Sequence, residues 1–340
     1  MFDHQSTETS FGRSSVGGQT GRVLQCRLSV VMLTIAHGLM YVDLSFQEQP
    51  RVIAAAVAQS AGGVVVIDPG PSTCLDTLHA ALGLHGMAVG DIQAILLTHI
   101  HLDHAGATGS LVRDNPDIKV YVHDRGAPHM VDPSKLLASA GRLYGDDMDR
   151  LWGQFLPVPE TNICTLSGGE KIDVAGRRFE VEYTPGHASH HVGFFDRSSG
   201  VAFVGDTAGV RTGNALFVMP PTPPPDIDVE NWLKSVELIR RWQPSTLFVT
   251  HFGPHEDAAL HLDAFVEHLA AMTDIARRVL EIDANDEDRQ TMFTAEAHAY
   301  LQRCLPPDEV DLYDFAAPLA LGWLGLVRYW RQRGVGAANS

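Results

Sequence analysis

Short apolar stretches separated by turn-forming residues run through most of the chain before about residue 250. Each is rich in Val, Ile, Leu or Phe and too short for a typical helix, which predicts strands at 53–57, 63–67, 92–97, 118–122, 179–183, 201–204 and 246–249. Residues 74–84 and 231–242 instead place apolar side chains three or four positions apart, which predicts amphipathic helices. This part of the chain therefore alternates strands with turns and helices.

The two ends of the chain depart from this pattern. Residues 1–21 are rich in Ser, Thr, Gly and Gln, which predicts a disordered tail. Beyond the last strand the pattern is purely helical, with helices expected at 257–282, 288–304 and 312–333. We therefore predict a tail over 1–21, a main domain over 22–256 and a C-terminal helical extension over 257–340.

Two internal segments interrupt the main domain. Residues 133–155 predict helices inside an insertion at about 124–157, which lies either beside a functional site or on the outside of the core. The proline-rich run 219–226 cannot be helical, and we expect a rigid loop that walls a pocket. The C-terminal helices likewise cover a site, form a homodimer contact or pack on the core.

One segment concentrates side chains that bind metals. The strand predicted at 92–97 is followed directly by the segment Thr98-His-Ile-His-Leu-Asp-His-Ala-Gly106. His99 and His101 are two positions apart, so extended backbone places them on one face. Asp103 and His104 come from the following turn and can point elsewhere. This arrangement suits two adjacent metal ions better than one.

Three later strands each lead to a further potential ligand. His187 follows Pro185-Gly186, Asp206 follows Gly205, and His251 follows Thr250. If these loops meet at one sheet edge, imidazole and carboxylate groups without cysteine would surround one spot, which suits Zn²⁺, Fe²⁺ or Mn²⁺. We predict that His99, His101 and His187 hold one ion, that Asp103, His104 and His251 hold the other, and that Asp206 bridges both.

These motifs resemble those of the metallo-β-lactamase-fold metallohydrolases, in particular the glyoxalase II-like branch. In order they are an aspartate after an early strand (Asp68), T-H-x-H-x-D-H-A-G, P-G-H, G-D and T-H, over about residues 30–256. The resemblance implies an α+β, four-layer αββα sandwich with metals at one edge, here with a C-terminal helical extension. Asp206 separates the chain from true β-lactamases, and His101 separates it from flavo-diiron proteins, which carry glutamate there.

Residues around the ligands have more than one interpretation. Asp68 either closes the turn in Asp-Pro-Gly or supports a ligating histidine from behind, and the resemblance favours support. His190 and His191 are candidates for substrate contact or for orienting His187. Tyr144 is a candidate donor at the mouth of the site.

Composition limits the partners. A formal charge of −16 and a pI near 5.4 disfavour nucleic acid, whose backbone requires a basic surface. The four cysteines include no C-x-x-C pair, which favours a reduced, cytoplasmic setting. No apolar run approaches the length of a membrane span. We therefore expect a small-molecule substrate, no nucleic-acid or membrane partner, and a candidate homodimer through the C-terminal helices.

The predicted activity is hydrolysis of a carbonyl ester, thioester or lactone by a metal-bridging hydroxide that Asp103 positions. The predicted cofactors are two divalent metal ions, with Zn²⁺ favoured and Fe²⁺ or Mn²⁺ as alternatives. The alternative function is an oxidoreductase similar to persulfide dioxygenases, with a single iron at His99, His187 and Asp206. A glutathione thioester would require an Arg and Lys cluster, which the sequence does not identify.

Overall fold

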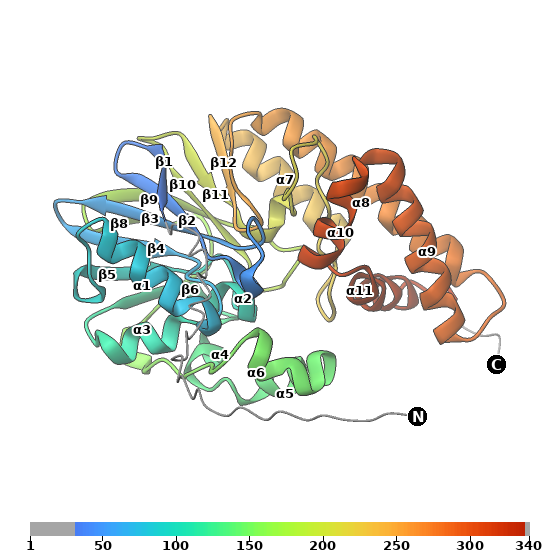
Figure 1. Ribbon diagram of the computed structural model, residues 1–340, viewed down its shortest axis with the longest axis horizontal. Helices are drawn as coiled ribbons and strands as arrows, with labels where there is room; N and C mark the ends of the chain where they lie inside the picture. Colours follow the sequence, from blue (N-terminus) through green and yellow to red (C-terminus); the bar gives the residue numbers. More distant parts are fainter. Residues whose placement is uncertain (1–30, 337–340) are drawn as a thin grey trace, which may run out of the picture.

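Two β-sheets lie face to face, and helices cover the outer face of each (Figure 1). The computed structural model describes residues 31–336, so the tail predicted over 1–21 lies outside the described residues. The arrangement confirms the predicted α+β class and the four αββα layers.

The first sheet has its strands in chain order. Strands β1 to β4 pair antiparallel, whereas β4 to β7 pair parallel to one another. The carboxyl ends of β4 and β5 therefore lie at the same edge. The strands are β1 (Met32–Ala36), β2 (Leu39–Asp43), β3 (Ala54–Ser60), β4 (Gly63–Ile67), β5 (Ile92–Leu96), β6 (Lys119–His123) and β7 (Ile163–Leu166).

The second sheet has the order β13-β12-β11-β10-β9-β8. Strand β10 is antiparallel to both β9 and β11, and β11 is parallel to β12, so β9, β11 and β12 all run in one direction. The strands are β8 (Lys171–Val174), β9 (Arg177–Tyr183), β10 (Val192–Asp196), β11 (Val201–Phe203), β12 (Thr246–Val249) and β13 (Gly253–His255).

Three apolar clusters hold the layers together. The cluster between the sheets contains alternate residues from both sheets, such as Val65 and Ile67 of β4 and Phe179 of β9, because successive strand side chains point to opposite faces. On the first sheet, α1 (Leu75–Leu84) and α3 (Thr108–Asp114) bury Leu78 and Leu111. Full burial of each such side chain contributes about 1.5–3 kcal/mol. The second sheet is covered by α7 (Val229–Trp242) and α8 (Ala258–Leu280).

The C-terminal helices differ from the prediction at one point. Helices α8 and α9 (Asp286–Cys304) match it, but the helix expected at 312–333 is two helices, α10 (Pro307–Ala316) and α11 (Leu319–Arg331). Pro318 lies between them, and proline cannot donate the backbone hydrogen bond that would continue α10. A single apolar cluster runs from β11 through α11, so a domain boundary at residue 257 stays a prediction.

Within the described range, no single helix is long and apolar enough to cross a membrane; α10 and α11 reach that length and composition only together, across a bend of 59°. The insertion forms α4 (Ala127–Val131), α5 (Ser134–Tyr144) and α6 (Met148–Leu151). In Figure 1 it lies at the lower edge of the sandwich, with α10 above it and α11 above and to its right. Trp152, just after α6, stacks on Phe46 with ring centroids 5.4 Å apart.

Candidate metal centre

The predicted ligands come from loops at one edge of the sandwich. His99 and His101 follow β5, His187 follows β9, and His251 follows β12. Asp103 and His104 lie in the short helix α2 (Leu102–Ala105), and Asp206 lies in the 3₁₀ turn Gly205–Ala208 after β11. Because the carboxyl ends of β9, β11 and β12 share one edge, these loops converge.

Two glycines permit this convergence. Gly205 has φ +45°, and a Cβ there would collide with the Thr98 hydroxyl. Gly186, before His187, has φ +143°, and a Cβ there would collide with Trp232 of α7. Residues with side chains rarely adopt these backbone conformations. The P-G-H and G-D motifs therefore contain glycine because both loops pass close to other parts of the protein.

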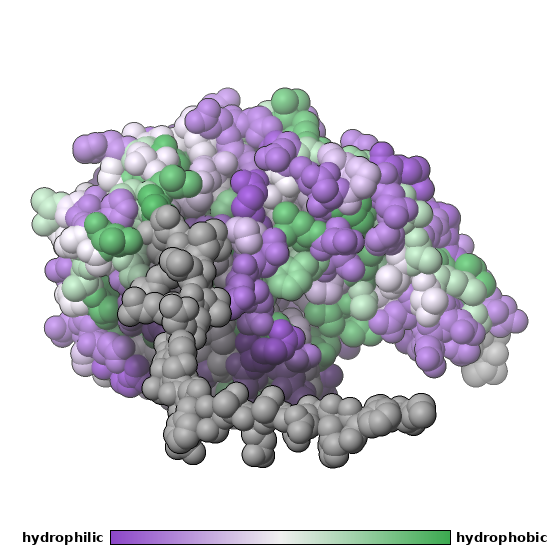
Figure 2. Space-filling model, viewed as in Figure 1, coloured by the Kyte–Doolittle hydropathy of each residue, from purple (hydrophilic) through white to green (hydrophobic). Residues whose placement is uncertain are grey.

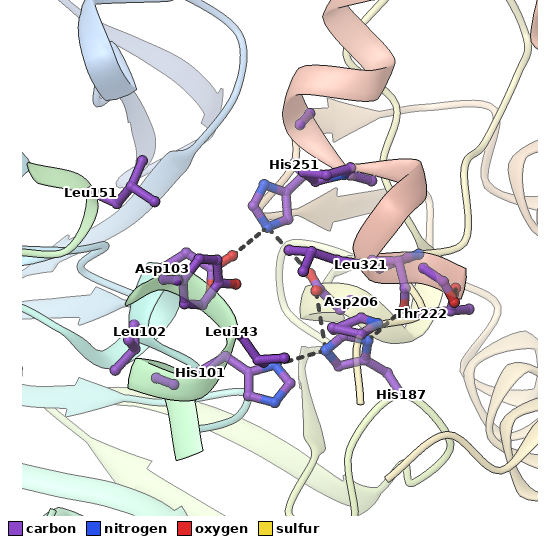
Figure 3. Close-up of a pocket in the computed structure, with 18 of the residues that line it drawn as sticks. His101, Leu102, Asp103, Leu143, Leu151, His187, Asp206, Thr222, His251 and Leu321 are labelled. Atoms are coloured by element: carbon purple, nitrogen blue, oxygen red, sulfur yellow. Dashed lines mark hydrogen bonds and ion pairs between the residues drawn. The ribbon is translucent and has the colours of Figure 1, made fainter. Parts of the chain in front are cut away.

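Three histidines form a first triad: His99, His101 and His187. The His101 Nδ1 atom lies 3.0 Å from His99 Nε2 and 2.9 Å from His187 Nε2. All three nitrogen atoms thus face one point, as the close-up shows for His101 and His187 (Figure 3). The structure brings together the residues predicted to hold one ion.

A second triad consists of Asp103, His104 and His251. His251 Nε2 lies 3.3 Å from Asp103 Oδ2, and His104 Nε2 lies 3.9 Å from the same oxygen. Asp206 lies between the triads. Its Oδ2 is 3.3 Å from His187 Nε2, a contact drawn in Figure 3, and its Oδ1 is 3.3 Å from His104 Nε2. Each carboxylate oxygen of Asp206 therefore faces a different triad.

The ring nitrogens that face away from the centre are held by other groups. His187 Nδ1–H donates to the Pro221 carbonyl (2.9 Å), and His251 Nδ1–H donates to the Val52 carbonyl (2.7 Å). These bonds orient the rings, so that the Nε2 atoms of both histidines point inward. The proline-rich loop thus positions His187 as well as walling the pocket.

Asp68 joins two of the ligand loops, the segment after β5 and the loop after β12, from beneath. Its Oδ1 accepts the Thr98 backbone N–H (2.8 Å), and its Oδ2 accepts from the Thr98 hydroxyl (2.7 Å), the Thr250 hydroxyl (2.8 Å) and His104 Nδ1–H (2.9 Å). Asp68 is buried and does not face the triads. This geometry fits the predicted supporting role behind His104.

The histidines of the first triad are neutral near pH 7. Burial, followed by the neighbouring histidines, lowers the pKa of His99 well below its usual range. The same causes lower the pKa of His101 to about 4. Burial also lowers the pKa of His187. Neutral imidazole is the form that ligates a metal.

In the second triad, by contrast, the histidine pKa values are raised rather than lowered. Burial alone would lower the pKa of His104 and His251, but the negative charges of Asp206 and Asp103 raise the pKa of both. Burial would raise the pKa of Asp103, yet the positive charge of His104 and the hydrogen bond from His251 lower this pKa to about 2. Positive charge is therefore strongly favoured between these carboxylates.

The donor set fits divalent cations. His104 Nε2 and Asp206 Oδ1 are buried without a hydrogen-bond partner in the described part of the chain, which is unusual unless an ion satisfies them. In the first triad, the nitrogen separations are within a few tenths of an ångström of the about 3.3 Å expected for two imidazoles on one tetrahedral Zn²⁺. The cluster therefore indicates divalent metal binding.

These charges predict how metal affinity depends on pH. A cation at the second triad must displace protons from His104 and His251, whose pKa values are raised, so affinity there should fall as pH falls. As pH falls below these raised pKa values, the loss should steepen toward a limit of about tenfold per pH unit for each displaced proton. The histidines of the first triad are already neutral, so metal affinity there should vary less with pH.

Co²⁺ titrations of metal-depleted protein at pH 6, 7 and 8 would measure both equivalents. The variant His251→Asn removes one of the competing protons and should flatten the steeper dependence. Equal pH dependence of the two equivalents in the wild type would contradict the assignment of charge to the two triads.

The two histidines that are candidates for substrate contact, His190 and His191, lie in different surroundings. His191 is buried; its Nε2 accepts the Asp206 backbone N–H (3.2 Å), and its Nδ1 lies 2.9 Å from the Thr184 hydroxyl. Both ring nitrogens are thus engaged by the protein, which does not support substrate contact and makes His191 a positioning residue for Asp206. The ring of His190 lies beside that of His101, with centroids 5.5 Å apart, and is not among the residues that line the cavity.

A cavity of about 390 Å³ lies over the two triads. His101, His187, Asp103, His251 and Asp206 all reach its surface, so both triads would act on one bound molecule. Residues of α5 and α6, the proline-rich loop and the α10–α11 corner form its walls. The insertion and the C-terminal helices therefore both lie beside the site.

Sequence reasoning missed the groups that hold the ligands in place. Thr98 and Thr250 each precede a histidine predicted to bind metal and donate to Asp68. The repeated Thr-His pair was the available signal, because the two threonines occupy equivalent places at the ends of β5 and β12. The carbonyls of Val52 and Pro221 leave no such signal, because any residue can supply a backbone carbonyl.

Comparison with known proteins places this geometry in a family. A sequence profile of the metallo-beta-lactamase superfamily matches residues 49–251. A metallo-beta-lactamase fold-containing protein of Sulfurisphaera tokodaii is 30% identical over 165 residues, covering 48% of this chain and 61% of that protein. A hydroxyacylglutathione hydrolase of Legionella pneumophila is 26% identical over 147 residues, covering 43% of each. The chain thus matches only about half the length of these relatives.

A solved structure shares the fold. The metallo-beta-lactamase family protein of Thermus thermophilus superposes with a TM-score of 0.62 at 22% identity, over 83% of this chain and 89% of that one. The superfamily profile, in turn, covers more than half of the chain, including every residue of the two triads. The chain therefore belongs to the metallo-beta-lactamase superfamily.

Proposed function

We propose that the chain is a dinuclear metal-dependent hydrolase that cleaves a carbonyl ester, thioester or lactone. The observation that carries the proposal is Asp206, whose two oxygens face separate triads at 3.3 Å. Such a carboxylate suits a bridge between two ions better than a single site. A relative at 26% identity is named as a hydroxyacylglutathione hydrolase, which supports hydrolysis as the reaction class.

In this proposal, each residue of the two triads has a distinct role. His99, His101 and His187 would hold one ion, Asp103, His104 and His251 the other, and Asp206 would join both. When bound, the ions would lower the pKa of a shared water and polarise the substrate carbonyl. Asp103 reaches the cavity surface with its pKa lowered to about 2, so its carboxylate stays ionised and can orient the attacking water. Water adds to the acyl carbon, the bond to the leaving group breaks, and a carboxylate leaves with an alcohol or thiol.

Metal removal tests this proposal. Protein prepared with excess metal should contain two ions per chain, lose hydrolysis of an ester and thioester panel after chelation, and regain it with Zn²⁺, Mn²⁺ or Fe²⁺. Elemental analysis and activity would be measured on the same samples. A single iron per chain, with oxygen uptake on a persulfide and no hydrolysis, would replace the proposal by the oxygenase alternative.

Tyr144 is proposed to donate a proton to the leaving group. It lines the cavity, and burial together with the charge of Asp103 raises the pKa of its hydroxyl, which therefore stays protonated. Tyr144→Phe should lower kcat on an alkyl ester by about tenfold or more, because an alkoxide needs a proton. A thioester should lose less than about threefold, because a thiolate leaves without one. Equal losses on matched oxygen and sulfur esters would indicate only a packing role against Trp152.

A further inference from the structure

The cavity over the triads has apolar walls that come from segments far apart in the sequence. Helices α5 and α6 contribute Leu143 and Leu151, and the α10–α11 corner contributes Phe315 and Leu321. The proline-rich loop 219–225 closes a third side. In Figure 3, Leu143 and Leu321 lie close to His187 and Asp206, and Leu151 lies further out, beyond Asp103. Most of the wall that a bound molecule would touch is therefore apolar; away from the metal centre, the polar side chains are Ser139, Tyr144, Thr222 and Asp314.

The charges that line the cavity are all of one sign. Besides the histidines they are Asp103 and Asp206 at the centre and Asp314 at the α10–α11 corner. None of the described residues that line the cavity is Lys or Arg. A substrate with carboxylates or phosphates on its leaving group, such as a glutathione or coenzyme A thioester, would leave those groups without a cation and next to Asp314. Burial of an unpaired charge is costly, so the walls disfavour such substrates.

The size of the cavity fits a medium-length chain. At roughly 30 Å³ for each water-sized group, 390 Å³ holds about a dozen non-hydrogen atoms. Phe315 at the wall is 44% exposed although it is large and apolar, and its ring lies 6.3 Å from that of Phe46. Apolar side chains also gather near the position of α10 in the space-filling view (Figure 2). A bound apolar chain would cover the exposed part of Phe315.

We propose that the cavity binds the acyl chain of an uncharged ester, thioester or lactone, with an apolar chain of about six to ten carbons. The reaction part of this inference rests on the proposed function, whereas the binding part does not. The acyl carbonyl lies at the two triads, and the chain runs between α5 and the α10–α11 corner. Water adds to the acyl carbon and its bond to the leaving oxygen or sulfur breaks. An ester or thioester then releases a fatty carboxylate and an uncharged alcohol or thiol, whereas a lactone opens to a single hydroxy carboxylate.

Chain length is the first variable to test. Metal-loaded protein is assayed on p-nitrophenyl esters from acetyl to dodecanoyl, and on octanoyl thioesters of N-acetylcysteamine and of glutathione. Each methylene buried should raise kcat/KM by up to about fourfold until the cavity is full. The neutral octanoyl thioester should exceed the glutathione thioester by about tenfold or more. Activity that is independent of chain length, or higher on the glutathione thioester, would overturn the inference.

Leu143→Arg tests the wall itself, because it places a cation where the chain would lie. The ratio of octanoyl to acetyl activity should fall by about tenfold or more, and the glutathione thioester should gain relative to its neutral counterpart. The matched control is Leu84→Arg at the end of α1, where the leucine is 71% exposed and does not line the cavity. The control should leave all ratios within about twofold of the wild type. An unchanged octanoyl to acetyl ratio in Leu143→Arg would contradict the inference.

A binding assay separates this inference from the proposed reaction. The neutral apolar probe octanamide, which is small enough for the cavity, should bind the wild type and Leu84→Arg in a calorimetric titration, and bind Leu143→Arg at least about tenfold more weakly. If the probe binds this way but no ester is hydrolysed, the pocket stands and the hydrolase proposal falls. If esters are hydrolysed but the probe does not bind, the hydrolase proposal stands and the pocket inference falls.

Discussion

Replacing Asp206 by alanine is expected to abolish hydrolysis and to lower the metal content from two ions per chain to at most one. The physical reason is that Asp206 has oxygens facing both triads, at 3.3 Å from His104 Nε2 and from His187 Nε2. Its removal would deprive both ions of a ligand and leave their spacing unset. The loss in kcat/KM should exceed the about 10–100-fold that removal of a supporting partner costs.

The measurement combines elemental analysis with kcat/KM on the most reactive ester. Asp173→Ala is the matched control, because Asp173 is an exposed aspartate on β8 that pairs only with Arg178. The control should keep two ions and nearly full activity. An Asp206→Ala protein that retained both ions and hydrolysed the ester would refute the bridging assignment.

The set of candidate ligands could be predicted because it depends on local sequence and strand direction. Each ligand follows an apolar strand, and parallel strands in one sheet end at the same edge. His187 and His251 are far apart in sequence, yet β9 and β12 run the same way and bring them together. Within the segment 98–106, the two-residue spacing of His99 and His101 in extended backbone places both in the first triad. Asp103 and His104 come from the turn that follows and belong to the second triad.

The supporting contacts could not be predicted, because they depend on loop paths rather than on residue type. His251 is held by the carbonyl of Val52, a contact between residues 199 positions apart. Asp68 was ambiguous in the sequence, since Asp-Pro-Gly also closes an ordinary turn. Only the packing of β4 against the ends of β5 and β12 shows that its carboxylate faces Thr98 and Thr250.

The helical walls of the cavity were also beyond sequence reasoning, whereas the proline-rich loop was predicted to wall a pocket and does so. Periodicity identified helices in the insertion and after residue 257, but not whether they lie beside the site. The α10–α11 corner reaches the cavity because the chain breaks at Pro318, a break that the apolar pattern over 312–333 conceals. Proline inside a helical pattern is a sufficient signal for such a break. Pro318 therefore indicates two helices, although the apolar pattern alone indicates one.

Asp68→Ala is expected to destabilise the metal-depleted protein by about 3–5 kcal/mol, a large part of the stability of an ordinary domain. The carboxylate is buried and accepts hydrogen bonds from the Thr98 backbone and hydroxyl, from Thr250 and from His104. Alanine leaves these donors buried without an acceptor, at a cost of about 1–3 kcal/mol for each one that water does not reach. Residue 68 also has φ +47°, which alanine tolerates less well than aspartate.

Asp68→Asn separates the lost carboxylate from the strained backbone, because asparagine also adopts positive φ and keeps one oxygen for the Thr98 N–H. Its amide nitrogen would replace Oδ2 and face the two hydroxyls and His104, so we expect an intermediate loss of stability. Urea unfolding in the presence of chelator measures both variants. In addition, both should weaken metal binding at the second triad by about 10–100-fold, because His104 loses the group that fixes its ring. If Asp68→Ala unfolded within about 1 kcal/mol of the wild type, Asp68 would be an ordinary turn residue, and the convergence of the ligand loops would require another cause.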